Sequence, residues 1–359
     1  MKKLRVAIIG QGRSGRDIHG AYFLSAANSN FEVVAVVDAI EDRRNRAAKD
    51  FGCPVFADYT ELFGMKDQID LVVNSTFSYM HAPITIDLAN HGFNVVCEKP
   101  FARRASDVDE MIAAAKKNGV MVTAFQQSRY APYYIKIKEL LATGKLGEIV
   151  QVSIKFNGFS RRWDWQTALR FNGGEVMNTG PHPMDQALDL LGYDVEMPNV
   201  FSKLGSINVA GDAEDYAKII LTAPGKPLFD IELSKQDAYA NGGWLYNIYA
   251  KNGSLRAGHK SVEWQWFDPA EKALPELQLT PLMHPETGYP MYCGETLNWH
   301  KETIELSGDP FTSAVHLYYT MIYNHLVNGA ELEITAEQVR RQIRVNELIH
   351  AQNPLEQKY

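Results

Sequence analysis

The chain has 359 residues, of which 45% are hydrophobic, and it carries a formal net charge of −7 at pH 7. This length predicts two domains, because a single hydrophobic core stops growing at roughly 250–300 residues. The acidic balance, without any run of Lys and Arg, argues against a nucleic-acid-binding face, and no apolar run is long enough to span a membrane.

The first forty residues carry the strongest pattern in the chain. An apolar run, residues 4–9, is followed directly by Gly10-Gln11-Gly12-Arg13-Ser14-Gly15, which has the spacing G-x-G-x-x-G. We expect a helix from there to about Ala27, and then a strand from Phe31 to Val37 that ends at Asp38. Strand, glycine motif, helix, strand and terminal acid together predict a dinucleotide-binding unit.

Each residue type in this unit has a physical role. Gly10 permits a tight turn, Gly12 lets a pyrophosphate approach the backbone, and Gly15 lets the helix pack against the strand. The carboxylate of Asp38 is suited to accept hydrogen bonds from two ribose hydroxyls. The alternative is a glycine-rich turn without a ligand, because the motif alone is a weak signal.

Strands and helices alternate up to residue 125, which is typical of an α/β fold with a doubly wound parallel sheet. Ser75-Thr76 and Glu98-Lys99-Pro100 each follow a strand, at the sheet edge where ligands bind. We expect a helix over 42–51, strands over 55–56 and 70–74, a helix ending at Gly92, a strand over 93–97, a helix capped by Ser106 and Asp109 and ending at Gly119, and a strand over 120–125.

The pattern changes after residue 125 to alternating strands, which indicates a mainly antiparallel sheet with one free face. This predicts a first domain over 1–125 and a second over 126–359. Asn252-Gly253 predicts a tight hairpin. We expect helices over 131–142, 311–328 and after Thr335, strands at about 150–156, 215–222, 228–235, 244–251, 254–258 and 261–267, and an irregular stretch over 268–309.

Two further clusters carry groups that are able to perform chemistry. Lys99, at the end of a strand beside the dinucleotide site, is able to hold a substrate hydroxyl and move its proton; a solvated surface lysine is the alternative. Residues 173–182 (Gly-Gly-Glu-Val-Met-Asn-Thr-Gly-Pro-His) lead into a helix predicted by the spacing of Asp185, Leu188 and Leu191. His182 would lie in its first turn, where the helix dipole favours a neutral, proton-accepting imidazole; a packing histidine is the alternative.

The glycine motif, Glu98-Lys99-Pro100 and the Gly173-to-His182 stretch, in this order, resemble the Gfo/Idh/MocA family, the group of glucose–fructose oxidoreductase and inositol dehydrogenase. The resemblance covers essentially the whole chain. It implies an N-terminal Rossmann domain and a C-terminal α/β domain with a large open sheet. It also implies binding of NAD, or possibly NADP, and activity on sugars, polyols or their derivatives.

The resemblance further implies a role for each matching position. Two departures stand out: Phe77 replaces a frequent proline, and Asn178 replaces a frequent aspartate, so that no carboxylate supports the imidazolium of His182. The implied roles are a phosphate turn from Gly10, Gly12, Arg13, Ser14 and Gly15, ribose binding by Asp38, nicotinamide contacts from Ser75, Thr76 and His81, cofactor or substrate contacts from Glu98, Lys99, Gln127 and Arg129, and catalysis by Lys99, Asn178 and His182.

Arg161 to Trp165 precede the Gly-Gly turn, and Arg162 and Trp163 suit carbohydrate or carboxylate binding. The alternative is an amphipathic loop that buries tryptophan. Trp244, Trp264 and Trp266 are expected in the core or in a subunit interface. A broad sheet with one uncovered face predicts a homo-oligomer.

The sequence therefore predicts an NAD(P)-dependent dehydrogenase that moves hydride between nicotinamide and a hydroxyl carbon of a sugar, polyol or inositol. Three widely spaced cysteines fit a reducing cytoplasm, without a metal or disulfide framework. Two alternatives remain: an epimerase or glycoside-cleaving enzyme that oxidises its substrate transiently, and a non-catalytic dinucleotide sensor. The intact Lys99 and His182 argue against the sensor.

Overall fold

Six parallel strands form the sheet of the N-terminal half in the computed structural model, which describes residues 3–240 and 243–359. Their order is β3-β2-β1-β4-β5-β6, so the order reverses between β1 and β4 and opens a crevice at the carboxyl ends of these strands. The strands are β1 (Leu4–Ile9), β2 (Phe31–Val37), β3 (Val55–Phe56), β4 (Leu71–Asn74), β5 (Val95–Cys97) and β6 (Val122–Ala124).

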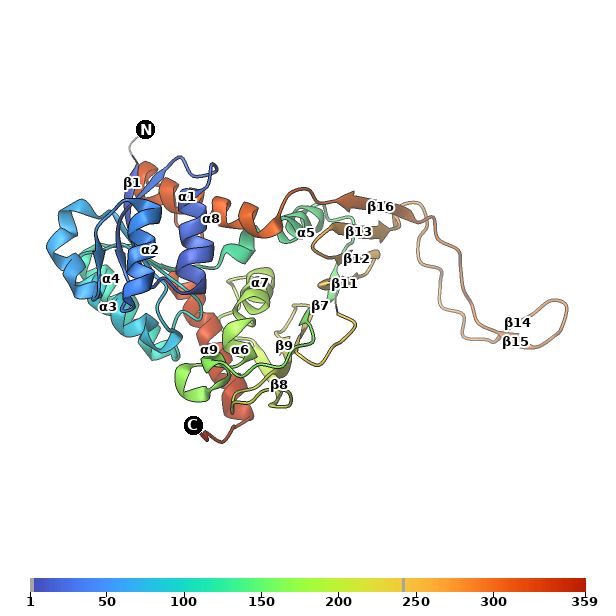
Figure 1. Cartoon of the computed structure of the whole chain (residues 1–359). Helices are drawn as coiled ribbons and strands as arrows, with labels where there is room; N and C mark the ends of the chain where they lie inside the picture. Colours follow the sequence, from blue (N-terminus) through green and yellow to red (C-terminus); the bar gives the residue numbers. More distant parts are fainter. Residues whose placement is uncertain (1–2, 241–242) are drawn as a thin grey trace.

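Helices cover this sheet because its strands are apolar on both faces, with most side chains of β1, β4 and β5 buried. Figure 1 shows them packed around the strands in blue and cyan. They are η1 (Gly15–Gly20), α1 (Ala21–Leu24), α2 (Glu41–Phe51), η2 (Tyr59–Gln68), η3 (Ser78–Met80), α3 (His81–Asn90) and α4 (Ala105–Asn118). The predicted α/β fold with a doubly wound parallel sheet is confirmed.

Eight strands form the second sheet, in the order β16-β13-β12-β11-β7-β10-β9-β8. All neighbouring pairs are antiparallel except β7 with β10, so the predicted mainly antiparallel sheet is confirmed. The strands are β7 (Ile149–Asn157), β8 (Asn199–Gly205), β9 (Tyr216–Thr222), β10 (Leu228–Ser234), β11 (Tyr246–Ala250), β12 (Gly253–Ala257), β13 (Ser261–Trp266) and β16 (His300–Glu305).

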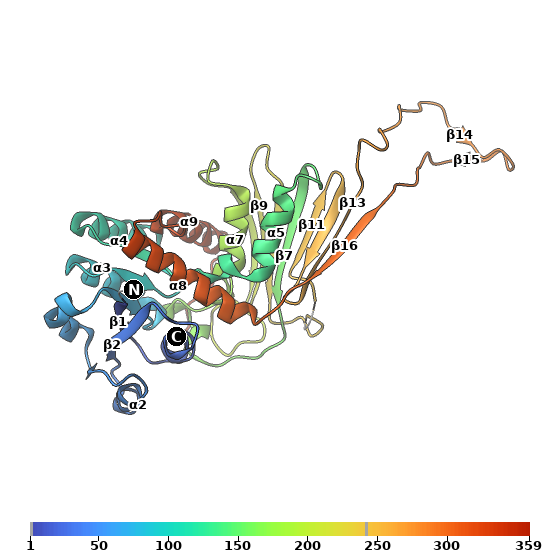
Figure 2. The same cartoon turned by 90° about the horizontal axis from the view of Figure 1, so that it is seen from above.

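Helices cover one face of this sheet, and the other face is left open (Figure 2). The inward residues of β9 and β10, such as Ile219 and Ile231, are buried, whereas their neighbours are half exposed. This alternation is the one expected for a half-buried strand. The covering helices are α5 (Pro132–Ala142) and α7 (Pro181–Leu191), with short η4 (Gln127–Tyr130) and α6 (Glu175–Asn178) before them.

The last two helices, α8 (Pro310–Asn328) and α9 (Ala336–Gln352), return to the N-terminal half. Tyr318 and Tyr319 of α8 are fully buried in the core of the first sheet. Helix α9 contributes to both cores, because Ile343 packs in the first and Ile349 in the second. The division into two domains at residue 125 stays a prediction. Helices α8 and α9 belong to the second half of the chain but pack in the first core.

Several sequence predictions of local structure were wrong. The helix after the glycine motif ends at Leu24 instead of Ala27, and it begins as a π-helix, η1. Helix α4 begins at Ala105, so Ser106 is not its cap, and Asp109 instead forms an ion pair with Arg340, 231 residues away. Strand β8 was not predicted, and β16 lies within the stretch expected to be irregular.

The Asn252-Gly253 hairpin was predicted correctly, with a shift of one residue. Ala250 pairs with Gly253, so the two-residue turn consists of Lys251 and Asn252. Residues 267–299 leave the edge of the sheet between β13 and β16 and extend far from the body (Figures 1 and 2). Within this segment only β14 (Leu282–Met283) and β15 (Pro290–Met291) pair. None of the helices in 3–240 and 243–359 is long and apolar enough to cross a membrane.

Candidate functional site

The glycine motif forms a turn that only glycine allows at two positions. Gly10 has φ +90°, and a Cβ there would lie 2.4 Å from the carbonyl oxygen of Ser75. A Cβ on Gly15 would lie 1.8 Å from the carbonyl oxygen of Gly10. Gly12 has no atom within 4 Å of its Cβ position, so its backbone is open to a ligand. Arg13 is exposed beside it, and Ser14 immediately precedes η1. These residues fit a pyrophosphate.

Asp38 lies at the end of β2 with its carboxylate held from both sides. The backbone N–H of Gln11 donates to Oδ2 at 2.7 Å, and the N–H of Ile40 donates to Oδ1 at 2.8 Å. A guanidinium nitrogen of Arg43 lies 3.5 Å from Oδ2. Each carboxylate oxygen retains a free lone pair, so the fixed carboxylate is able to accept ribose hydroxyls.

The segment after β4 lies against the glycine turn. Ser75 Oγ donates to the carbonyl of Ile9 at 3.0 Å, and Thr76 Oγ1 donates to Asn74 Oδ1 at 2.7 Å. His81 is buried, with Nδ1 2.7 Å from the Pro100 carbonyl oxygen and Nε2 3.1 Å from that of Thr76. Burial lowers the pKa of His81. His81 thus joins the two segments that follow β4 and β5.

One cavity of ≈ 450 Å³ brings the three sequence clusters together. Two buried polar atoms in it have no hydrogen-bond partner in the described part of the chain: Oε1 of Gln127 and Nδ1 of His182. Buried polar groups are nearly always paired, so these two atoms are available to a polar ligand or to water. The cavity is lined by Arg13, Asp17, Ile18, Glu98, Lys99, Phe125, Gln127, His182 and Phe311.

Lys99 is held between two anchors in this cavity. Its Nζ donates to the backbone carbonyl of Asn178 at 2.8 Å, and its backbone N–H donates to Glu98 Oε2 at 2.8 Å. Burial lowers the pKa of Lys99, and the charge of Glu98 opposes this effect. The ammonium retains two free N–H groups that are able to reach a substrate oxygen.

The structure adds His19, which the sequence analysis missed. His19 is fully buried in η1; its Nε2 lies 3.3 Å from Glu98 Oε1, and its Nδ1 lies 2.6 Å from the hydroxyl of Tyr319. Burial raises the pKa of Glu98, but the hydrogen bond and charge of His19 and the charge of Lys99 outweigh it and lower that pKa to about 2. Glu98 therefore remains a carboxylate beneath Lys99.

His182 lies in the first turn of α7, as predicted, and is half buried. Burial and then the charge of Lys99 lower the pKa of His182 to about 3. Its imidazole is therefore neutral at physiological pH, which agrees with the prediction from the helix dipole.

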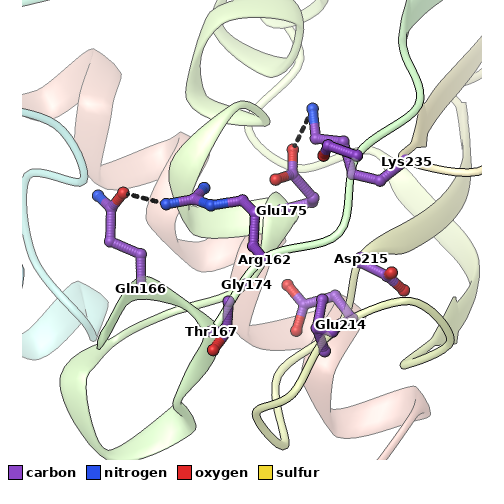
Figure 3. A pocket seen from close by; sticks show the side chains of 10 residues that line it. Arg162, Gln166, Thr167, Gly174, Glu175, Glu214, Asp215 and Lys235 are labelled. Atoms are coloured by element: carbon purple, nitrogen blue, oxygen red, sulfur yellow. Dashed lines mark hydrogen bonds and ion pairs between the residues drawn. The ribbon is translucent and has the colours of Figure 1, made fainter. Parts of the chain in front are cut away.

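Asn178 meets Lys99 through its backbone and not through its side chain. Helix α6, which ends at Asn178, is fixed at its start by Glu214, whose Oε1 accepts from the N–H of Val176 at 3.0 Å. Figure 3 shows the small polar cavity on this side of α6, where Lys235 forms an ion pair with Glu175 at 3.1 Å. These buried contacts position the carbonyl that holds Lys99.

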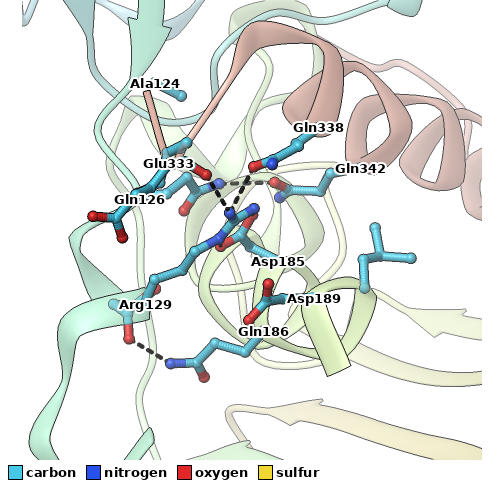
Figure 4. A network of polar contacts seen from close by, with 12 residues as sticks. Ala124, Gln126, Arg129, Asp185, Gln186, Asp189, Glu333, Gln338 and Gln342 are labelled. Carbon is cyan, nitrogen blue, oxygen red and sulfur yellow. Dashed lines mark hydrogen bonds and ion pairs between the residues drawn. The ribbon is translucent and has the colours of Figure 1, made fainter. Parts of the chain in front are cut away.

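Arg129 does not line the cavity. Its guanidinium donates to both carboxylate oxygens of Asp185 at 2.7 Å and to Gln338 Oε1 at 2.6 Å (Figure 4). The side chains of Arg129 and Asp185 are only 10% and 2% exposed. This arrangement connects η4, α7 and α9 and gives Arg129 a structural role, and its substrate contact stays a prediction.

Arg162 and Trp163 also lie outside the cavity that contains Lys99. Arg162 donates to Asp164 and to Gln166 Oε1, and Trp163 is 81% exposed. Both line a separate groove of ≈ 390 Å³. Trp264 is buried and stacks on Trp266 at 4.0 Å between ring centroids, as expected for core residues. No cluster of three or more His, Cys, Asp or Glu able to bind a metal occurs in 3–240 and 243–359.

Comparison with known sequences places this site in a family. Residues 4–126 match the oxidoreductase family with an NAD-binding Rossmann fold, GFO_IDH_MocA, and residues 134–256 match the GFO/IDH/MocA C-terminal domain. The chain belongs to the Gfo/Idh/MocA family. The predicted resemblance is confirmed, and residues 4–126 form the NAD-binding Rossmann domain of a member of this family.

Individual relatives are distant. An uncharacterised oxidoreductase of Schizosaccharomyces pombe, C115.03, is 28% identical over 63% of this chain and 62% of its own length. The scyllo-inositol 2-dehydrogenase (NADP+) IolW of Bacillus subtilis is 24% identical over 96% of this chain and 92% of its own. Thus the chain spans about three fifths of the length of the yeast relative and nearly all of IolW.

Among solved structures, the WlbA dehydrogenase of Chromobacterium violaceum, in complex with NADH and UDP-GlcNAcA, aligns with a TM-score of 0.75. It is 19% identical, and the alignment covers 98% of this chain and 94% of that chain. At this identity the likeness shows the fold alone, and it extends over both sheets.

Proposed function

We propose that this protein is a nicotinamide-dependent dehydrogenase that oxidises a CH–OH group of a sugar, polyol, inositol or sugar derivative. The observation that carries the proposal is the single cavity in which the glycine turn, Lys99 and His182 meet, with unpartnered polar atoms on Gln127 and His182. The scyllo-inositol dehydrogenase activity in the name of IolW supports the substrate class.

The residues fit a bound dinucleotide, because Gly12 is open and Asp38 is preorganised. The nicotinamide, when bound, accepts the hydride from the substrate carbon. The protein holds the substrate carbon beside the nicotinamide, and its side chains accept the proton that the hydroxyl loses.

Lys99 acts on the substrate oxygen. One of the two N–H groups left after its bond to Asn178 donates to that oxygen and stabilises the negative charge that develops as the proton leaves. Glu98 keeps Lys99 charged at the end of β5, and His182, neutral and with Nδ1 free, accepts the proton.

The test is a screen of purified protein with NAD+ and NADP+ against sugars, inositols and sugar acids, followed by the absorbance of the reduced nicotinamide. A dehydrogenase accumulates reduced cofactor in proportion to oxidised product. Product without net reduced cofactor would instead indicate the transient-oxidation alternative, and cofactor binding without any turnover would indicate the sensor.

The cofactor preference is a separate prediction, NAD over NADP. Asp38 repels a 2′-phosphate, but Arg43 lies beside it and offers a cation to the same phosphate. We expect NAD to bind more tightly, and Arg43→Ala to weaken NADP further while changing NAD little. Fluorescence titration of both cofactors measures this, and tighter binding of NADP to the parent protein would contradict it.

We also propose a cytoplasmic homo-oligomer that pairs through the open face of the second sheet. Tyr249 on β11 is 51% exposed on this face, while its neighbour Ile248 is buried. Tyr249→Glu places a charge on this face and is expected to weaken self-association in sedimentation experiments. An unchanged mass of the variant would exclude this face as the interface.

A further inference from the structure

The second sheet has two edges, and the described residues cover only one of them. At the β8 edge, side chains from the end of α9 bind backbone groups of the edge strand. Gln352 Nε2 donates to the carbonyl of Val200 at 2.7 Å, and Asn353 Oδ1 accepts from the N–H of Leu204 at 3.1 Å. The opposite edge is β16, the outermost strand in Figure 2, which pairs only with β13 in the described part of the chain.

The register of β13 with β16 shows which backbone groups of β16 point outward. The N–H of Leu306 donates to the carbonyl of Lys260 at 2.7 Å, in line with the register of the two strands. Along an antiparallel ladder, every second residue of a strand bonds to a given neighbour. Counted from Leu306, these residues have even numbers. The N–H and C=O groups of Lys301, Thr303 and Glu305 therefore point away from β13, toward the open edge.

This open edge has no partner in residues 3–240 and 243–359. No hydrogen bond joins the outward backbone groups of Lys301, Thr303 and Glu305 to other described residues, and all three side chains are exposed. Lys301 and Glu305 also form no ion pair with a described residue. Unpaired edge groups of this kind form a template for another strand. The edge therefore offers a row of donors and acceptors with a cation at one end and an anion at the other.

A second copy of β16 matches this edge. If two copies pair antiparallel around a two-fold axis at Thr303, each Lys301 lies opposite the partner's Glu305, and Thr303 lies opposite the partner's Thr303. All outward N–H and C=O groups of the three residues then have partners, because every outward residue faces another outward residue. Opposite charges on facing residues also stabilise a pair of strands.

Neighbouring registers are less favourable. An axis at Glu302 would place Glu302 opposite the partner's Glu302, and like charges in facing positions destabilise a sheet. An axis at Ile304 would place Lys301 opposite the partner's Ser307, beyond the end of the strand, and would lose the ion pair. An axis between two residues would set outward groups opposite inward ones, so that no ladder forms. The sequence and the strand direction together select one register.

The charges also restrict the partner. Charged side chains on an edge strand normally protect it from pairing with foreign strands. Here an incoming antiparallel strand needs an acid opposite Lys301 and a base opposite Glu305, at the spacing of these two residues. Strand β16 itself meets this requirement, which favours a second copy over an unrelated strand.

We propose that β16 of one copy pairs with β16 of a second copy, so that the two eight-stranded sheets form one continuous sheet across a two-fold axis at Thr303. Trp299, which is 45% exposed, falls opposite the partner's Ser307, so the pairing also covers part of this indole. This edge contact differs from the pairing through the open face proposed above. It concerns self-association and does not depend on the dehydrogenase assignment.

Charge reversal tests the register. Lys301→Glu places a carboxylate opposite the partner's Glu305, and Glu305→Lys places an ammonium opposite the partner's Lys301, so each variant alone has only like-charge pairs. In a mixed dimer of the two variants, both facing pairs are again of opposite charge. We expect each variant to raise the dimer Kd about tenfold in sedimentation analysis, and the mixture to associate more tightly than either variant by itself. Lys117→Glu, at an exposed lysine of α4, is the control and is expected to leave the Kd unchanged.

Thr303→Pro tests the backbone contact. The N–H of Thr303 points outward, so proline removes a donor of the interface and keeps the hydrogen bonds of β16 to β13. We expect the dimer Kd to rise at least about tenfold. If this variant does not fold, as circular dichroism would show, the mixture of the charge-reversal variants decides alone.

All variants are compared in the Tyr249→Glu chain, in which the contact through the open face is weakened. The proposal is overturned if the Tyr249→Glu chain with native β16 is a monomer over the whole concentration range, because the edge would then be left for a strand of another protein. It is also overturned if the mixture of Lys301→Glu and Glu305→Lys gains nothing, or if a folded Thr303→Pro chain dimerises as tightly as the chain with native β16.

Discussion

Lys99, Glu98 and His182 form one electrostatic cluster, in which Lys99 and Glu98 shift each other's pKa and both shift that of His182. Glu98 is a buried carboxylate with a pKa of about 2, because His19 and Lys99 stabilise its charge more than burial opposes it. Lys99 in turn helps to keep His182 neutral, with a pKa of about 3. The cavity therefore holds a cation, an anion and a neutral imidazole at fixed positions.

Replacing Lys99 tests its role in turnover. Lys99→Ala is expected to lower kcat by about a hundred- to ten-thousand-fold, because it removes the group that stabilises the substrate oxygen. Cofactor binding, measured by fluorescence titration, is expected to change little, because Lys99 has no role in the glycine turn. Lys155→Ala, an exposed lysine on β7, is the control. Unchanged kcat in Lys99→Ala would make Lys99 a structural residue.

Asn178→Asp tests whether a carboxylate at this position raises the pKa of His182. Asn178→Asp adds a negative charge four residues before His182 and is expected to raise its pKa above about 3. The acidic limb of kcat/KM for oxidation should then move to higher pH. NMR titration of the imidazole measures the pKa directly, and pH–rate profiles measure the limb. An unchanged titration would show that the two side chains are not coupled, and a limb that survives His182→Ala would exclude His182 as the base.

At the scale of elements, local signals identified most of the strands and helices that carry the site. The glycine motif, the capping box of Thr335 with Gln338 and the hairpin before Gly253 depend on neighbouring residues, so sequence spacing was sufficient. His19 was missed because its partners, Glu98 and Tyr319, lie 79 and 300 residues away. Its one signal is a histidine on the helix face shared with Gly15, four residues earlier.

Arg129 shows the same limit of sequence spacing, because its position suggested a contact with the substrate. It lies just beyond β6, where a ligand is expected, but its bidentate partner, Asp185, is 56 residues away. The sequence gives no sign of which acid an arginine will meet. Strand β16 was hidden for a similar reason, since residues 267–299 separate it from its partner β13.

The buried ion pair of Arg129 with Asp185 predicts a large loss of unfolding free energy when one partner is removed. Arg129→Met leaves Asp185 charged without its partner, which typically costs about 3–5 kcal/mol of unfolding free energy. Arg340→Ala removes an exposed pair with Asp109 and is the matched control, expected to cost at most about 1 kcal/mol. Urea denaturation measures both. If Arg129→Met is as stable as the control but raises KM strongly, Arg129 contacts substrate after all.

At the scale of the whole molecule, the site is assembled from segments that lie far apart in the sequence. The carboxyl edge of the first sheet supplies Asp38 and Lys99, the segment before the second sheet's β8 supplies His182, and α8 supplies Tyr319 behind them. The fold class follows from periodicity along the chain, but the return of α8 and α9 to the first core does not, because their apolar faces fit either sheet. Packing between distant segments decides that choice.

The loss of stability at acid pH reports this arrangement, because it depends on the pKa of the buried His182. Its pKa is about 3 in the folded protein and near 6.5 when unfolded, so below pH 6.5 the unfolded chain binds a proton that the native state excludes. Stability is therefore lost as the pH falls from about 6.5 towards 3. Glu98, with a folded pKa of about 2 against an ordinary 4.5, contributes stability that is lost only below about pH 4.5. The two windows overlap between about pH 4.5 and 3, and of these two groups His182 alone acts above about pH 4.5.

We expect His182→Gln to flatten the decline of the unfolding free energy between pH 6.5 and 5 by about 1 kcal/mol, and to leave in place the part of the decline below pH 4.5 that Glu98 causes. Urea denaturation at a series of pH values measures the difference, with His300→Gln, an exposed histidine, as the control. Parallel curves for the parent and His182→Gln would mean that the native cavity accommodates an imidazolium. In that case burial and the charge of Lys99 do not lower the pKa of His182, and its imidazole takes up a proton near pH 6.5, as an unperturbed histidine does.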